Sequence, residues 1–372
     1  MNIVLRERRS PTLHDFPYRG EGRKCYHKWI VNVTPPGREH CVHSCLYCYA
    51  RDAVYSRRGD GGMVVYSNLA AMVEKELDRL ALCPPVSISN TTDPCQDVPE
   101  LRCVVKDLIE VLVRWGVSFH IITKGDPSFL SQVEGFPGSG RFFLEVTIEG
   151  PPEILTLLSP HAPTYEQRLD SLRWAGSLGL PALVRLDPVI PPLWRALYGE
   201  DWIDRAGEVL ADGAAAGAKH VVSSTGRFTA ATRNALVGTV RPISEIQGRA
   251  AGDDYAHDRS GTSSGFMLRH EMRLAFHRRM RAAARELGMT YAVCQELAAD
   301  EADTPGLPHC EAFPMPFSRR VGPRQFEPIP GCTANCHTRC VGMQDPACGK
   351  PELALSQPYL PSLLKRRGDL TF

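Results

Sequence analysis

Three cysteines lie close together near the start of the chain, at Cys41, Cys45 and Cys48. They follow the apolar and β-branched run at residues 29–34, which predicts a β-strand, so they fall on the loop at that strand's carboxyl end. This is the edge at which α/β barrels gather their functional groups. Three thiolates at the spacing C-x3-C-x2-C can hold three irons of a 4Fe–4S cube and leave the fourth iron open for a small molecule.

Two other interpretations of these cysteines are weaker. A structural zinc site usually pairs its ligands as C-x2-C and needs a fourth ligand, which His43 supplies only by straining a short loop. Buried apolar cysteines do not fit the charged residues Arg38, Glu39 and His40 that lead into the motif. Ligand number and strand-end placement therefore favour an iron–sulfur cluster.

Strands and helices alternate after the cysteine loop. Further strands are predicted at residues 86–89, 119–123, 142–148, 183–186 and 220–224, and helices at 67–82, 101–115, 165–178 and 202–216. Strands separated by helices imply a parallel sheet, so the predicted fold is of the α/β class: a partial (β/α)6 barrel with an irregular, cysteine-rich C-terminal extension.

The predicted organisation has three parts. They are an N-terminal extension at 1–28, the barrel at 29–290 with a surface excursion or lid at 229–265, and a cysteine- and proline-rich extension at 291–372. We expect the last part to cover the mouth of the barrel, where it would contribute to substrate specificity.

Composition and charge limit the classes of partner. The 372 residues are 43% hydrophobic and 23% charged, as in a globular protein, and the formal net charge of +1 gives no overall reason to expect a polyanion. An arginine-rich helix predicted at 267–287 is either a solvated face or, less favoured, a polyanion contact. No apolar run reaches about 18 residues and the N-terminus is charged, so we expect no membrane span and no signal peptide. Thirteen cysteines in such a chain predict a reducing compartment, the cytoplasm.

A second group of cysteines occupies the C-terminal part of the chain, at Cys294, Cys310, Cys332, Cys336, Cys340 and Cys348. Proline is frequent there and limits regular structure, so metal binding would supply the folding free energy that the segment lacks. We prefer an auxiliary 4Fe–4S cluster, with structural zinc as the next interpretation. Six thiols either fill one four-cysteine site and leave two over, or contribute to two sites. The remaining cysteines, Cys25, Cys83, Cys95 and Cys103, are separate from both groups, and Cys25, Cys83 and Cys103 are interpreted as ordinary small hydrophobes.

Beyond the cysteines, several stretches resemble the branch of the radical S-adenosylmethionine (SAM) superfamily that contains spore photoproduct lyase and DNA repair photolyases. They are residues 48–51, 91–94, 122–124, 159–163 and 185–191, and the resemblance covers about half of the chain, from 29 to 193. It implies that one electron, from a flavodoxin- or ferredoxin-type reductant, drives cleavage of SAM to a 5′-deoxyadenosyl radical that takes hydrogen from the substrate.

The resemblance also implies which residues hold the cofactors. Cys41, Cys45 and Cys48 would ligate the SAM-binding 4Fe–4S cluster. The candidates for holding SAM lie at strand ends or in the cysteine loop, and they are Tyr47, Thr92, Asp93, Thr123, Lys124, Thr147 and Arg185. Arg185 would pair with the SAM carboxylate, and Asp93 would accept a hydrogen bond from its amino group or ribose. Each has a competing structural role, such as a turn at Asp93 before Pro94.

Two departures from the lyase pattern affect the function. Asn90 stands where the lyase has its hydrogen-donating cysteine, and Cys95, on the same loop, either replaces that donor or has no role. The C-terminal cysteine group lies outside the lyase pattern and indicates a different substrate.

We therefore expect a radical SAM enzyme that abstracts hydrogen from a natural product, a sugar or a peptide. The second hypothesis is a repair lyase that acts on damaged DNA, which the arginine-rich helix supports and the near-zero net charge does not, so nucleic acid is the less favoured partner. The third is a metal-stabilised nucleic-acid-binding or electron-transfer protein without SAM chemistry.

Overall fold

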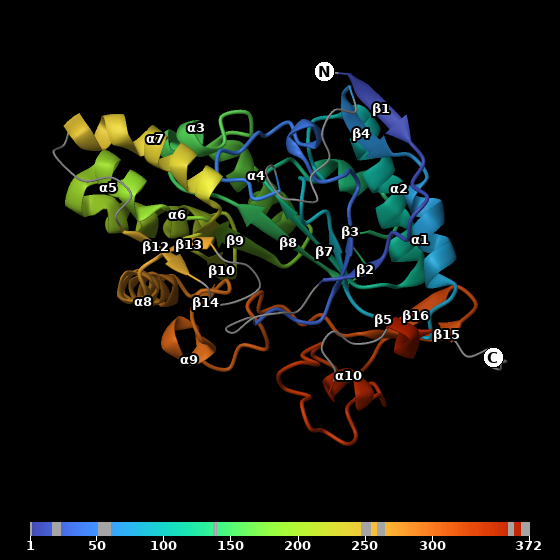
Figure 1. The fold of residues 1–372 in the computed structure, drawn as a ribbon. Coiled ribbons are helices and arrows are strands. Elements are labelled where there is room, and N and C mark those ends of the chain that lie inside the picture. Colours follow the sequence, from blue (N-terminus) through green and yellow to red (C-terminus); the bar gives the residue numbers. More distant parts are fainter. Residues whose placement is uncertain are drawn as a thin grey trace.

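An eight-stranded sheet forms the centre of the protein, in the order β14-β10-β9-β8-β7-β6-β3-β2 (Figure 1). Neighbouring strands run parallel, except that β2 is antiparallel to β3. Because the edge strands β14 and β2 do not pair with each other, the sheet is open, which confirms the α/β class and the partial barrel. The strands are β2 (His14–Asp15), β3 (Trp29–Val31), β6 (Val86–Ile88), β7 (Phe119–Thr123), β8 (Phe142–Thr147), β9 (Ala182–Leu186), β10 (His220–Ser223) and β14 (Thr290–Val293).

The computed structural model describes residues 2–16, 24–50, 61–136, 138, 140–246, 254–258, 265–355 and 361–365. Arg51, part of the motif at 48–51, lies outside these residues. Within them, no helix combines the length and the apolar character needed to cross a membrane.

Helices connect the strands and lie outside the sheet. They are α1 (Leu69–Leu77), α2 (Pro99–Trp115), α3 (Pro152–Leu158), α4 (Tyr165–Ser177), α5 (Pro191–Tyr198), α6 (Trp202–Ala215), α7 (Ala230–Ile246), α8 (His270–Glu286), α9 (Ala299–Ala302) and α10 (Glu352–Leu355), with short 3-10 turns at η1 (Arg38–His40), η2 (Ser128–Gln132), η4 (Gly199–Asp201) and η5 (Pro361–Leu364). Helix α2 begins on a proline at its first position and ends at Gly116, whose φ of 71° is left-handed. Gly213 of α6 lies so close to β9 that an added Cβ would come 2.5 Å from the Val184 side chain. Val184 therefore faces the helices, and its neighbour Arg185 faces the inner side of the sheet.

The predicted excursion at 229–265 contains regular structure. Helix α7 fills its first half, and β12 (Tyr255–Asp258) pairs with β13 (Gly265–Leu268), which also pairs with β11 (Arg227–Phe228). Helix α7 lies at the periphery of the molecule (Figure 1), where few positions must be apolar, and this accounts for its weak periodicity. The role of a lid, and the limits of the three parts, stay predictions.

The C-terminal cysteine segment lies at the amino-terminal edge of the sheet. Strand β15 (Ser318–Gly322) pairs with β16 (Gln325–Pro328) and with β5 (Leu82–Cys83), which comes directly before β6. The amide of His27, just before β3, donates to the carbonyl of Ala334 at 2.7 Å. Figure 1 shows α10 and β16 on this side, with β16 beside β5 and α10 below them. The expectation that this segment covers the barrel mouth is therefore wrong, because the mouth lies at the opposite edge.

A separate two-stranded sheet stands beside the cysteine loop. Strand β1 (Ile3–Arg6) runs parallel to β4 (Met63–Tyr66), and the amide of Tyr66 donates to Val33 at 3.1 Å, next to β3. The N-terminal residues are thus part of the folded body.

Candidate active site

The three motif cysteines lie together on the loop after β3 and η1, at the carboxyl edge of the sheet. Cys45 is buried, and Cys41 and Cys48 are partly exposed. Burial raises the pKa of the Cys41 thiol to about 12 and that of Cys45 to about 11. Within the described residues, the one trio of Cys, His, Asp or Glu ligand atoms that lie within 4.8 Å of one another is elsewhere. No three ligand atoms of these cysteines and His43 thus come within 4.8 Å of one another, which favours a multi-iron cluster over a single ion.

Neighbouring strand ends hold the cysteine loop in place. The amide of Val42 donates to Gln96 Oε1 at 2.7 Å, and the amide of Leu46 donates to the carbonyl of Leu158 at 2.8 Å. Gln96 follows β6 and Leu158 ends α3, so the loop is fixed from two sides.

A buried carboxylate, Glu149, organises the centre of the site. It accepts hydrogen bonds from the Tyr47 hydroxyl and from the Arg168 guanidinium, and Lys124 Nζ lies 3.7 Å from its Oε1. Burial acts to raise the pKa of Glu149, but the cations of Arg168 and Lys124 outweigh it and hold that pKa below its usual value. Arg168 also donates to the carbonyl of Thr147 at 3.0 Å and to Ser159 Oγ at 2.9 Å. Glu149 is absent from the predicted site residues. It nevertheless lies just after β8, and a polar residue at a strand end is the pattern on which Asp93 and Lys124 are predicted.

Asp93 joins two neighbouring strand ends. Its carboxylate accepts from the Cys95 amide at 2.8 Å, from Thr123 Oγ1 at 2.6 Å and from the Lys124 amide at 2.6 Å. Its Oδ2 also lies 3.8 Å from the Nδ1 of His43, in the cysteine loop. The structure thus brings Tyr47, Asp93, Thr123 and Lys124 together around the cysteines, and Thr92 lies beside them.

Three other predicted residues lie deeper. The Arg185 guanidinium donates to Glu145 Oε2 at 2.7 Å and to Asp187 Oδ2 at 2.6 Å, so two carboxylates already satisfy it. Thr147 is 4% exposed, and Cys95 is 1% exposed and packs in the hydrophobic core. The roles of Arg185 and Thr147 in SAM binding, and of Cys95 as hydrogen donor, stay predictions.

The inner face of the sheet carries a buried polar layer that the sequence analysis missed. Its members come from the strands and from segments on both sides of them, and they are Tyr26, Lys28, His120, Glu145, Arg185, His309 and Glu311. Lys28 Nζ lies 2.7 Å from Glu311 Oε1, and burial raises the pKa of Glu145 to about 7. Lys28 and Glu311, which are more than 280 positions apart in sequence, meet here, and no local sequence pattern predicts such a contact.

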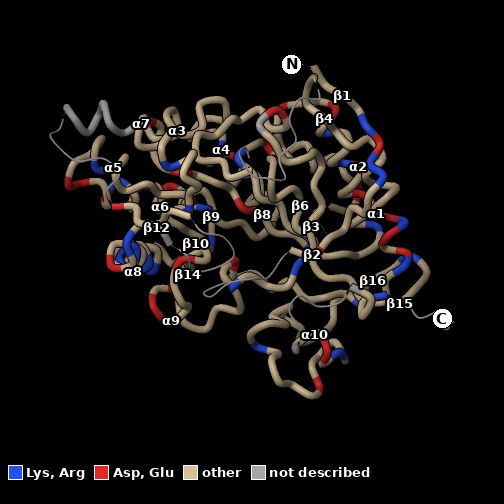
Figure 2. Tube along the Cα trace, in the orientation of Figure 1, with Lys and Arg blue, Asp and Glu red and all other residues tan. Residues whose placement is uncertain are grey.

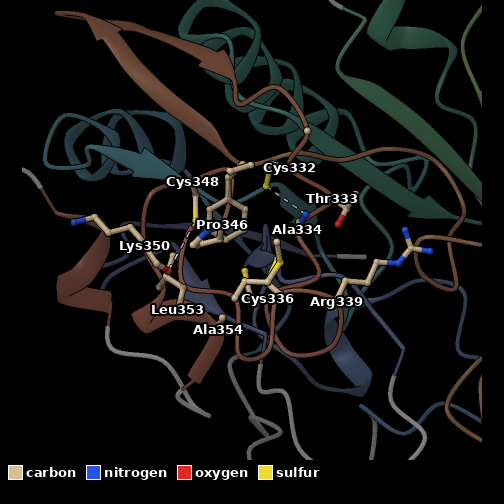
Figure 3. Close-up of a pocket in the computed structure, with 15 residues that line it drawn as sticks. Cys332, Thr333, Ala334, Cys336, Arg339, Pro346, Cys348, Lys350, Leu353 and Ala354 are labelled. Carbon is tan, nitrogen blue, oxygen red and sulfur yellow. Dashed lines mark hydrogen bonds between the residues drawn. The ribbon is translucent and has the colours of Figure 1, made fainter.

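The six C-terminal cysteines divide into two sets. Cys332, Cys336, Cys340 and Cys348 line one cavity of about 230 Å³ at the amino-terminal edge, and Figure 3 labels Cys332, Cys336 and Cys348 around it. The other two lie elsewhere. Cys310 Sγ is 3.9 Å from the sulfur of Cys25, and Cys294 Sγ is 3.8 Å from the Arg185 guanidinium.

Three arginines of α8 contact other parts of the fold. Arg279 donates to Asp204 Oδ1 at 2.9 Å, Arg278 to the carbonyl of Glu301 at 3.1 Å and Arg281 to that of Asp303 at 3.1 Å. Figure 2 shows basic residues along α8, with acidic residues on the neighbouring α9. This arrangement favours a solvated, internally paired face over a polyanion contact.

The chain is similar in sequence to two viral proteins. No family model matches the chain. It is 23% identical to the radical SAM Nα-GlyT isomerase of Pseudomonas phage M6, over 91% of this chain and 70% of that protein. It is 26% identical to the uncharacterized protein ORF301 of Acidianus two-tailed virus, over 46% of this chain and 60% of that protein.

Solved structures of spore photoproduct lyase share the fold. The lyase complexed with dinucleoside spore photoproduct superposes with a TM-score of 0.53 at 16% identity, over 78% of this chain and 81% of the lyase. A lyase mutant in which serine replaces one cysteine gives a TM-score of 0.53 at 15% identity. The chain thus shares the fold of spore photoproduct lyase, carries its three-cysteine loop at the carboxyl edge of that fold, and is similar over most of its length to a radical SAM isomerase.

Proposed function

We propose that this protein is a radical SAM enzyme that binds a 4Fe–4S cluster on Cys41, Cys45 and Cys48. SAM would bind at the open iron, and the enzyme would abstract a hydrogen atom from an organic substrate. When bound, the cluster and SAM together supply a 5′-deoxyadenosyl radical. The observation that carries the proposal is the loop of three thiols at the carboxyl edge, which has no fourth ligand among the described residues close enough to complete a single-ion site. A one-electron reductant of the flavodoxin or ferredoxin type is the proposed partner.

The chain's own residues would prepare this site. A cluster takes its cysteines as thiolates, and the Lys124 ammonium lowers the cost of ionising Cys45. Lys124 is only 16% exposed and stands between Glu149 and the ring of Tyr47, so its position is fixed. Asp93 holds the backbone that carries Lys124, and we assign it a positioning role.

An auxiliary 4Fe–4S cluster on Cys332, Cys336, Cys340 and Cys348 is the second part of the proposal. Tetrahedral zinc, with Zn–S bonds of about 2.3 Å, would bring its sulfurs to about 3.8 Å from one another. No three of these thiols meet within 4.8 Å, and they surround a cavity of about 230 Å³, which supports a larger group. Because this cavity lies at the amino-terminal edge, we infer a structural or electron-transfer role, away from the substrate.

A nucleoside is the substrate class that the comparisons favour over a sugar or a peptide. The fold relative was solved in complex with dinucleoside spore photoproduct, and the phage relative is an isomerase of Nα-GlyT. Three arginines of α8 already donate to groups of the fold, which reduces the face available to phosphates, so a nucleoside or short oligonucleotide fits better than extended duplex DNA. Repair of DNA damage stays an alternative within this class.

The test is anaerobic reconstitution with iron and sulfide, followed by electron paramagnetic resonance with and without SAM. We expect SAM to perturb the signal and 5′-deoxyadenosine to form in the wild type and in a Cys103→Ala control, in which an exposed cysteine is lost. The Cys41→Ala/Cys45→Ala/Cys48→Ala variant should show neither effect. A wild-type signal indifferent to SAM would refute the proposal. Deuterium passing into 5′-deoxyadenosine from labelled peptides or sugars, with none from labelled dinucleosides, would refute the nucleoside assignment.

A further inference from the structure

A third group of metal-ligand atoms lies apart from both cysteine sites. Cys25 Sγ and Cys310 Sγ are 3.9 Å apart, and Cys310 Sγ is 3.0 Å from Glu311 Oε2. All three residues are buried, and in the described part of the chain theirs are the three ligand atoms that come within 4.8 Å of one another. Neither Cys25 nor Glu311 has a part in the proposed radical chemistry.

The spacing of this trio fits one ion. Tetrahedral zinc with Zn–S bonds of about 2.3 Å and a Zn–O bond of about 2.1 Å sets the two sulfurs about 3.8 Å apart and each sulfur about 3.6 Å from the oxygen. The observed sulfur–sulfur distance of 3.9 Å already matches. The sulfur–oxygen distance of 3.0 Å reaches the expected value by a small rotation of the Glu311 carboxylate.

A buried histidine beside the trio points independently to a missing ligand. The side chain of His309 is 0% exposed, and its Nδ1 lies 3.3 Å from Glu311 Oε2. Its Nε2 has no hydrogen-bond partner among the described residues, and the Glu311 carboxylate is the polar group beside its Nδ1. A buried imidazole left in this way costs free energy, and coordination of a metal ion by one of its nitrogens would offset that cost.

The charges around the trio also balance with an ion present. Two thiolates and one carboxylate around a divalent ion leave one negative charge. The Lys28 ammonium, whose Nζ lies 2.7 Å from the other oxygen of Glu311, neutralises it and orients the carboxylate. Thiolate and imidazole ligands select zinc among the common divalent ions.

We propose that Cys25, Cys310 and Glu311 bind one structural zinc ion. His309 lies outside the group of ligand atoms within 4.8 Å of one another, so its ring would turn toward the ion to become the fourth ligand. The ion would fasten the segment before β3 to the segment after α9 across the inner face of the sheet. Two contacts already bring these segments together: the amide of Cys310 donates to the carbonyl of Lys24 at 3.3 Å, and Lys24 Nζ lies 2.6 Å from Asp303. The zinc site therefore closes the barrel from the amino-terminal side.

The test counts zinc and iron per chain in protein purified without oxygen and reconstituted with iron and sulfide. We expect about one zinc in the wild type and in a Cys332→Ser/Cys336→Ser variant, which removes zinc bound adventitiously at the other cysteine cavity. Cys25→Ser and Cys310→Ser should lose this zinc, whereas Cys83→Ser, which changes another buried cysteine, should keep it. These counts do not depend on enzymatic activity.

A conservative variant keeps the test valid if the cysteine variants do not fold. Glu311→Gln keeps the shape of the side chain, and we expect it to release zinc to a chelator at least about tenfold more readily than the wild type. Zinc content unchanged in Cys25→Ser and Cys310→Ser would overturn the proposal. So would loss of iron in place of zinc from these variants, or a Cys25–Cys310 disulfide found by mass spectrometry in the anaerobically purified wild type.

Discussion

Replacing Glu149 by glutamine tests whether its buried carboxylate organises the site. The side chains of Glu149 and Arg168 are both 0% exposed, and Lys124 is 16% exposed on the other side of the carboxylate. Glutamine keeps the shape and an oxygen that can accept the Tyr47 hydrogen bond. The change therefore removes the negative charge and little else, and it leaves two cations without their shared counter-charge.

The expected loss of stability follows from this burial. Removing one partner of a buried ion pair typically costs about 3–5 kcal/mol, because the remaining charge stays buried and uncompensated. We expect the free energy of unfolding of Glu149→Gln to fall by about 3 kcal/mol, near the lower limit, because the residual exposure of Lys124 lets water screen part of its charge. The same change should reduce iron incorporation, because the Glu149 charge holds Lys124 in place beside the cysteine loop.

Urea denaturation followed by circular dichroism, on protein kept free of oxygen, measures the loss. The matched control is Glu208→Gln, because Glu208 pairs with Arg205 at 2.8 Å on the surface, where the two side chains are 60% and 51% exposed. That variant should change the free energy of unfolding by less than about 0.5 kcal/mol.

A double-mutant cycle supplies the decisive comparison. If Glu149 and Arg168 act as a buried pair, Glu149→Gln/Arg168→Met should lose clearly less stability than the sum of the two single variants. Additive losses, or a Glu149→Gln variant as stable as Glu208→Gln, would refute the reasoning. Normal iron incorporation in a destabilised Glu149→Gln variant would separate the stability of the fold from the assembly of the site.

Three further predictions concern other parts of the fold. A Cys332→Ser/Cys336→Ser variant should contain about four fewer irons per chain after reconstitution, yet keep the SAM-dependent resonance signal. Burial raises the pKa of Glu145 from 4.5 to about 7, so the folded protein holds a proton that the unfolded chain releases in this window. The free energy of unfolding that this group contributes therefore decreases as the pH rises from 4.5 to 7. In Glu145→Gln, urea denaturation at several pH values should show a decrease that is smaller by about 3 kcal/mol. Gly125→Ala should lower the free energy of unfolding by about 1–3 kcal/mol, because the new methyl group would meet the Cys95 carbonyl oxygen at 2.1 Å, whereas Gly176→Ala, in open space on α4, should raise it by up to about 1 kcal/mol.

Each of these has a contrary outcome. Unchanged iron in the double cysteine variant would exclude the auxiliary cluster. A fall in stability between pH 4.5 and 7 that survives in Glu145→Gln would assign it to another group. Gly125→Ala and Gly176→Ala shifting stability in the same direction would show that the space around these glycines does not control it.

The cysteine loop and the strands of the sheet could be predicted because their signals are local. The run at 29–34 and the spacing of Cys41, Cys45 and Cys48 need no knowledge of distant residues. The selection of polar strand ends found Asp93, Thr123 and Lys124, which the structure brings together. The same rule applied to the residues after β8 would have found Glu149.

The rest depends on contacts between distant parts of the chain. Cys25 is 285 residues from Cys310, so its place beside that residue has no local signal, and the sequence alone favours a small hydrophobe there. Cys310 and Cys294 group with the other C-terminal cysteines by their nearness in sequence, whereas in the structure they lie beside Cys25 and Arg185 instead. The predicted position of the C-terminal extension is wrong for the same reason, because the pairing of β15 with β5 fixes it and no repeat predicts that pairing.

The two cysteine-rich regions at opposite edges of the sheet restrict where a substrate can enter. Strand β7 has five residues, which at about 3.3 Å per residue separates the edges by about 16 Å. The buried polar layer, with Lys28, Glu145 and Glu311, and the proposed zinc site fill the inner face between them. We therefore expect a substrate to reach the proposed radical site from the carboxyl edge. We expect substrate specificity to come from the loops at that edge. The cavity around Cys336 would then stabilise the fold or carry electrons.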